Sequence, residues 1–211
     1  ARLFAGQGLP NSQLLMPTSL RQLPILALAL TKSAALGSRS FSADFKAFNA
    51  YELLTSTPNQ LTLSLYPRIY DIGEKTMLRA TYNALTTGSG ACLVYTGSIF
   101  MIYLTSNVDP QIIVDLWGVE SLQEVPPFAD EIPTFDNETN NWVQRLMSEL
   151  PLRVGRSWCP LQIVRQELDG AEYVLRSMMS EDPLETCPSY DRYIQRLHDR
   201  AKNYKETESW F

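Results

Sequence analysis

"ACLVYTGSIFMIYL", residues 91–104, is the stretch that decides the fold. Thr96, Gly97 and Ser98 form a turn signal between two runs rich in aliphatic and aromatic residues, which is the pattern of a β-hairpin. The second run, residues 99–104, is apolar or aromatic at every position, so both of its faces must be covered. A strand of that kind lies at the centre of a sheet, with other elements on each side. The stretch therefore predicts a sheet flanked by helices.

Helices that could cover the sheet follow the hairpin. Asp109 and Pro110 are an N-cap and a first-turn proline, and Gly118 ends the short helix that they begin. The spacing of apolar residues predicts four more elements. These are a helix over residues 142–150, a strand over 161–166, a helix over 173–178 and an amphipathic helix over 190–201.

The chain before the hairpin divides into a helical part and a first strand. Apolar residues recur at helical spacing over residues 12–37, and Ser42 is a plausible N-cap for a second helix that stops at Pro58. Residues 61–65, "LTLSL", alternate at period two and predict a strand. Because proline removes a ladder donor, we expect this strand to close near Pro67, at the border of the sheet.

Composition excludes several classes of protein. The 211 residues carry a formal net charge of −5 and no basic run, which argues against a nucleic-acid partner. The three cysteines are far apart and form no CxxC pair, so we expect reduced thiols and no zinc site. The longest apolar run, residues 25–30, is far short of the ~20 residues of a membrane span. Because the chain begins with Ala1, we expect it to be part of a longer protein.

The sequence offers little chemistry. His198 is the only histidine and lies on a predicted surface helix. "GSG", residues 88–90, precedes a strand and lacks the lysine of a phosphate loop, so it is expected to be a plain loop. The acidic pair Glu181 and Asp182 has no ligand spacing and is expected on the solvated surface. Arg68 could reach a nucleotide phosphate in a partner, but a structural ion pair is favoured. No catalytic residue and no metal ligand is therefore predicted.

Several sequence pieces, taken in order, resemble a known family. They include "LYPRIY" at residues 65–70, "LTSNV" at 104–108 and "SED" at 180–182 followed by "SY" at 189–190. In this order they resemble the C-terminal part of the cargo-adaptor subunit of the COPII vesicle coat. The resemblance covers roughly residues 10–204.

The resemblance implies an α+β fold, with residues 1–58 as the end of an all-helical domain. Residues 59–211 are then a gelsolin-like domain, with a central mixed sheet flanked by helices and a C-terminal helix. The implied function is noncatalytic: selection of cargo for vesicles that leave the endoplasmic reticulum for the Golgi. The implied location is the cytosolic face of the endoplasmic reticulum and of COPII vesicles, peripheral to the membrane.

The resemblance also implies partners. They are the GTPase-activating COPII subunit in a heterodimer, transmembrane cargo and SNARE sorting signals, and a Sar-family GTPase reached through the coat. No cofactor is expected in this stretch, because the zinc ribbon of the family would lie upstream.

Two pairs of residues are candidate contact sites. The resemblance points to Met178 and Met179 for cargo, although Met178 lies in register with Tyr173 and could instead belong to the core. Pro67 and Arg68 are expected at an interface with another part of the adaptor. Two alternative functions stay open. They are the GTPase-activating subunit of the same coat, acting through Arg68 or Arg153, and an independent gelsolin-like module that binds actin or calcium.

Overall fold

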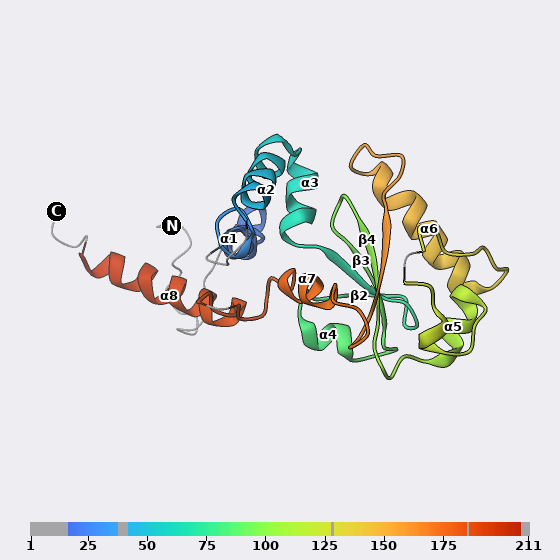
Figure 1. The fold of residues 1–211 in the computed structure, drawn as a ribbon. Helices are drawn as coiled ribbons and strands as arrows, with labels where there is room; N and C mark the ends of the chain where they lie inside the picture. Colours follow the sequence, from blue (N-terminus) through green and yellow to red (C-terminus); the bar gives the residue numbers. More distant parts are fainter. Residues whose placement is uncertain (1–16, 38–41, 128, 185, 208–211) are drawn as a thin grey trace.

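The computed structural model describes residues 17–37, 42–127, 129–184 and 186–207, with helices gathered around a five-stranded sheet (Figure 1). The strands lie in the order β2-β1-β3-β4-β5. Their bounds are β1 Arg68–Asp71, β2 Thr76–Leu78, β3 Ala91–Tyr95, β4 Phe100–Leu104 and β5 Leu161–Arg165. All neighbours are antiparallel except β4 and β5, which are parallel, so the sheet is mixed as predicted.

The described helices frame this sheet. They are α1 Leu23–Lys32, α2 Ala43–Thr55, α3 Pro58–Leu65, α4 Tyr82–Thr86, α5 Pro110–Trp117, α6 Glu138–Leu152, α7 Glu172–Ser177 and α8 Tyr190–Thr207, with short 3-10 turns at Thr18–Leu20 and Leu122–Glu124. The α+β fold class is confirmed. Ser42 caps α2 and Asp109 caps α5, each through its own side chain, as their positions in the sequence predict. The boundary between a helical domain and a gelsolin-like domain at residue 58 stays a prediction.

The sheet separates two hydrophobic clusters. Phe100, Ile102 and Leu104 point into the cluster that α5 and α6 cover. Met101 and Tyr103 point into the opposite cluster, beneath α4 and α7. Figure 1 shows these helix pairs on opposite sides of the strands. No residue of β4 is more than 1% exposed, which confirms the prediction of a central strand covered on both faces.

The helical part lies beside the sheet instead of on it. In Figure 1, α1, α2 and α3 stand together at one end of the sheet, and α8 runs out from the same end. Helix α1 packs against both α3 and α8, although these two helices are far apart in sequence. The first and last described helices of the chain are therefore neighbours in space.

The first predicted strand is a helix. Residues 61–65 belong to α3, which begins with a capping box between Thr57 and Gln60 and has Pro58 in its first turn. These signals fix the first turn of a helix, and the leucines at period two do not outweigh them. Only Leu63 and Leu65 of this helix are buried.

The prediction that Pro67 closes a strand at the sheet border is also wrong. Pro67 lies between α3 and β1, and Arg68 opens β1 opposite Tyr95 of β3. Strand β1 lies between β2 and β3, so the sheet edges are β2 and β5. The proline is tolerated because it precedes the ladder and gives up no ladder hydrogen bond.

A pair of threonine substitutions tests the helical assignment of α3. Thr57→Ala removes the capping hydroxyl and should lower the free energy of unfolding by about 1 kcal/mol, measured by denaturant titration. Thr62→Ala, within the same helix, should cost less than about 0.5 kcal/mol because alanine is the better helix former. A loss at Thr62 that exceeds the loss at Thr57 would favour a strand, where threonine is preferred.

Candidate functional site

The turn between α7 and α8 is polar yet buried. We call residues 180–182 the SED turn; Ser180 is 4% exposed and Glu181 is 7% exposed. Buried polar groups must find partners inside the protein. The SED turn finds them on four separate elements, so it is the place where the helical part, the sheet and the C-terminal helix meet.

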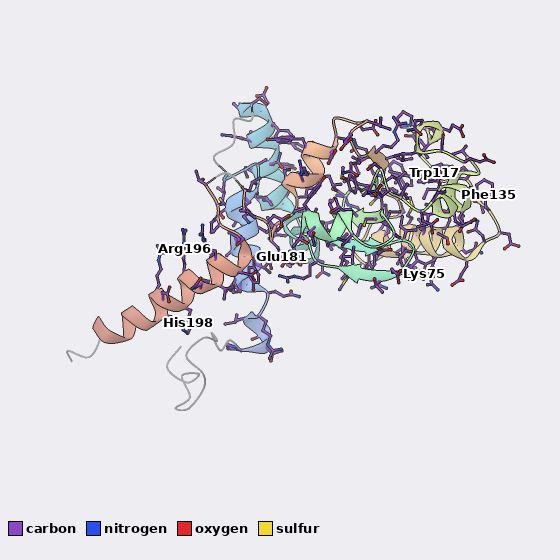
Figure 2. The ribbon with its side chains drawn as sticks, turned by 90° about the horizontal axis from the view of Figure 1, so that it is seen from below. Lys75, Trp117, Phe135, Glu181, Arg196 and His198 are labelled. Carbon is purple, nitrogen blue, oxygen red and sulfur yellow. The ribbon has the colours of Figure 1, made fainter. Side chains whose placement is uncertain are left out.

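Glu181 is the centre of this arrangement. Its Oε1 accepts a hydrogen bond of 2.5 Å from the Tyr66 hydroxyl, just after α3. Its Oε2 accepts from the guanidinium of Arg79, with Nε at 2.8 Å and Nη2 closer still. The main chain joins the same two segments, because Glu181 N donates to Ala80 O at 3.1 Å, next to Arg79. Figure 2 shows Glu181 near the N-terminal end of α8.

Burial and the Glu181 carboxylate keep Tyr66 protonated. Burial, followed by the hydrogen bond to the carboxylate, raises the pKa of Tyr66 to about 12. The same carboxylate raises the pKa of Arg79 by hydrogen bonding and charge. Both partners therefore hold their protons over the whole physiological range, and the contact is a stable one.

Lys32 attaches the helical part to the same turn. Its Nζ donates to Ser180 O at 2.7 Å and to Asp182 O at 2.6 Å, and the residue is only 4% exposed. Burial lowers the pKa of this ammonium group below its usual value. Ser180 Oγ also donates to Leu65 O at 2.7 Å, which fixes the end of α3.

Asp182 completes the turn on the side of the sheet. Its Oδ2 accepts a 2.5 Å hydrogen bond from the main-chain N–H of Tyr82, at the start of α4. The Tyr82 hydroxyl then donates to Glu172 at 2.8 Å, and Arg176 lies 3.9 Å above the Tyr82 ring. The SED turn is thus continuous with a polar network that holds α4 against α7.

The expectation that Glu181 and Asp182 are solvated surface acids is wrong. Both act as acceptors between elements that are about a hundred residues apart in sequence. Spacing along the chain does not reveal such pairs. The sequence contains one signal: Lys32 lies two residues after the apolar run 25–30, and a lysine on a buried helix face needs acceptors nearby.

The structure gathers most of the predicted contact residues at this junction. Met179 is 2% exposed and belongs to the core cluster beneath α4 and α7. Met178 is partly buried against the same cluster, whereas Tyr173, with which it was grouped, is 62% exposed. Pro67 is buried and directly follows Tyr66, the partner of Glu181. The roles of these residues in binding stay predictions.

Arg68 lies at the start of β1 and is half-buried. The ion pair expected for Arg68 is not found within the ranges that the structure describes. Arg153, at the end of α6, is 61% exposed and stands 3.9 Å from Glu149.

The loop at residues 88–90 is hydrogen-bonded to the side chain of Asp71. Ser89 donates to Asp71 from its N–H at 3.1 Å and from its hydroxyl at 2.6 Å. Gly88 and Gly90 both have positive φ, and a side chain at Gly88 would collide with the Asp71 carboxylate. Gly88 therefore leaves room for the carboxylate of Asp71, and the loop binds a side chain of the protein itself. Among the described residues, no group of three or more His, Cys, Asp or Glu could hold a metal ion.

Comparison with known proteins shows that the chain is similar to vesicle-coat proteins. Residues 3–63 match the family description "Sec23/Sec24 helical domain". The crystal structure of the human COPII-coat protein Sec24c has the same fold, with a TM-score of 0.74 at 23% identity over 91% of this chain and 26% of that one.

The sequence relatives are more specific. The chain is 28% identical over 207 residues to "Protein transport protein sec24" of Schizosaccharomyces pombe. The match covers 88% of this chain and 22% of the relative. It is 23% identical to mouse "Protein transport protein Sec24A", over 89% of this chain and 18% of the relative. It is 21% identical to "SED5-binding protein 3" of Saccharomyces cerevisiae, over 91% of this chain and 24% of the relative.

These findings confirm the resemblance to the C-terminal part of the COPII cargo adaptor, which is Sec24. The chain spans less than a quarter of each of these three relatives. In the described ranges, no helix combines the length and the apolar character needed to cross a membrane.

A substitution at Tyr66 tests the junction through its pH dependence. Tyr66→Phe should lower the free energy of unfolding at pH 7 by about 1–3 kcal/mol, since a hydrogen bond to a buried carboxylate is lost. Because the folded protein holds the Tyr66 proton more tightly, the wild-type advantage is complete below pH 10 and declines as the pH approaches about 12.

The matched control for Tyr66→Phe is Tyr51→Phe on α2, where the side chain is 63% exposed. It should change stability by less than about 0.5 kcal/mol at any pH. Equal effects at the two tyrosines, or an advantage that grows above pH 10, would contradict the proposed role of Glu181.

Proposed function

We propose that this chain is a noncatalytic part of a COPII coat adaptor that selects cargo for export from the endoplasmic reticulum to the Golgi. Similarity to Sec24 proteins along about nine-tenths of the chain carries the proposal. The buried polar groups at the SED turn support it, because their hydrogen bonds go to other parts of the chain and hold the elements in place. The adaptor acts at the cytosolic face of the endoplasmic reticulum and of COPII vesicles, peripheral to the membrane.

The proposed partners follow from the same similarity. They are the GTPase-activating COPII subunit in a heterodimer, transmembrane cargo and SNARE sorting signals, and the Sar-family GTPase reached through the coat. The name of the relative "SED5-binding protein 3" states that it binds SED5. We propose that this chain takes part in recognising partners of the same kind. Zinc is proposed only for a ribbon upstream of this stretch.

Within the chain, we propose Met178 as the residue that contacts cargo and Met179 as its support. Met178 is partly buried at the end of α7, next to the rigid SED turn, so its side chain is held in place and still reaches the surface. Met179 is enclosed in the core, where it fixes the backbone of its neighbour. A contact residue that is held rigidly loses less entropy when it binds.

Capture of cargo tails by the protein at its full natural length tests the proposal. The protein, purified with the GTPase-activating COPII subunit, is passed over immobilised cytosolic tails of transmembrane cargo. Wild type should retain at least one tail, and Met178→Asp should reduce that retention by about tenfold. Met77→Asp on β2 introduces the same change at a methionine that is 69% exposed, and it should leave retention unchanged.

Two results would contradict the proposed function. One is a wild-type protein that retains no tail under conditions in which the coat assembles. The other is a protein that accelerates GTP hydrolysis by the coat GTPase with no partner subunit and loses this activity in Arg68→Ala or Arg153→Ala. Retention that is unaffected by Met178→Asp would remove only the assignment of Met178.

A further inference from the structure

A pocket lies where the SED turn leads into α8. Its volume is about 440 Å³, and Pro183, Cys187, Pro188, Ser189, Arg192 and Arg196 contribute to its wall. Leu184 and Cys187 exchange two main-chain hydrogen bonds of 2.8 and 3.0 Å, which fix one side of the pocket. The Cys187 thiol lies 4.0 Å from Thr31 O, so the same wall also touches the helical part. The pocket is therefore built on the rigid junction.

Two arginines give the pocket its charge. Arg192 and Arg196 are four residues apart on α8, so their side chains share one helix face about one turn apart. Both are exposed, and within the described ranges neither forms an ion pair. Figure 2 shows that Arg196 and His198 leave α8 on opposite sides. The result is a concentrated positive site on a chain whose net charge is −5.

The chemistry of this pocket suits carboxylates on a peptide. A guanidinium presents a planar fork of donors that pairs with a carboxylate through two parallel hydrogen bonds. Pro183 and Pro188 add apolar walls, against which the aliphatic part of an acidic side chain can pack. The volume admits one or two side chains and not a folded domain.

A membrane surface is the weaker candidate. Asp191 and Asp199 are exposed on the same helix as the two arginines, so the exposed surface of α8 is not uniformly basic. The site is also concave, whereas a lipid surface engages a broad and uniformly basic face. Shape and charge together favour a short acidic segment of a protein.

We propose that this α8 pocket binds an acidic peptide segment of a protein partner, through carboxylates paired with Arg192 and Arg196. The proposal goes beyond the cargo contact at Met178, since it uses other residues and another chemistry. Its test involves neither cargo tails nor coat subunits, so its failure is distinguishable from a failure of the proposed function.

Fluorescence anisotropy with defined peptides tests the pocket on the protein at full length. The probe is fluorescein-labelled Gly-Glu-Glu-Glu-Gly, and the reference is the same peptide with Gln in place of each Glu. At about 0.15 M salt, where long-range attraction is screened, the acidic peptide should bind at least about tenfold more tightly. Arg192→Glu combined with Arg196→Glu should abolish this preference.

Arg200→Glu is the control, because it reverses the charge of one exposed arginine of α8 that does not line the pocket. It should alter the affinity by less than about twofold. If the double charge reversal lowers the melting temperature, Arg192→Gln with Arg196→Gln replaces it and should also abolish the preference.

Three results would overturn the proposal. The first is an equal loss of affinity in Arg200→Glu, which would indicate diffuse attraction instead of a pocket. The second is equal binding of the Glu and Gln peptides. The third is cosedimentation with phosphatidylserine vesicles that is lost in the double variant, while the peptide fails to bind; this would assign the arginines to a membrane surface.

Discussion

The hydrogen-bonded charges of the SED turn hold the molecule together. Glu181 accepts from Tyr66 and Arg79, and Lys32 donates to the carbonyls on either side of Glu181. Glu181 and Lys32 are buried and would be costly to bury alone, and each is stable because it has hydrogen-bond partners from other parts of the chain. The turn thereby joins a helical part to a sheet that has its own two-sided core. The position of α8, and with it the pocket formed by the SED turn and α8, depends on this joint.

Local patterns in the sequence predicted local structure well. The hairpin, the helix that begins at Pro110, the helix predicted over 142–150 and the strand predicted over 161–166 are all confirmed, because caps, turn residues and apolar periodicity act over a few neighbouring positions. The error at residues 61–65 has the same origin. Three leucines at period two suggest a strand, whereas the capping box of Thr57 and Gln60 starts a helix.

The contacts of the site could not be predicted from spacing. Tyr66 and Glu181 are 115 residues apart, and Lys32 and Ser180 are 148 residues apart. Nothing in the local sequence around Glu181 distinguishes a buried acceptor from a solvated acid. The resemblance to the COPII cargo adaptor pointed to Met178 and to the neighbouring "SED" sequence. The structure adds the hydrogen bonds that hold this region in place.

A rigid joint between three parts of a chain is suited to presenting surfaces. The central claim is that the helical part and the sheet form one cooperative unit because of Lys32 and the SED turn. Native-state hydrogen exchange measures this directly, by comparing the opening free energies of amides in α1 and in β4. The account predicts equal values in wild type, and in Lys32→Met a fall of about 1–3 kcal/mol in α1 with no change in β4. Amides of α1 that already open more easily than those of β4 in wild type, and that do not respond to Lys32→Met, would contradict it.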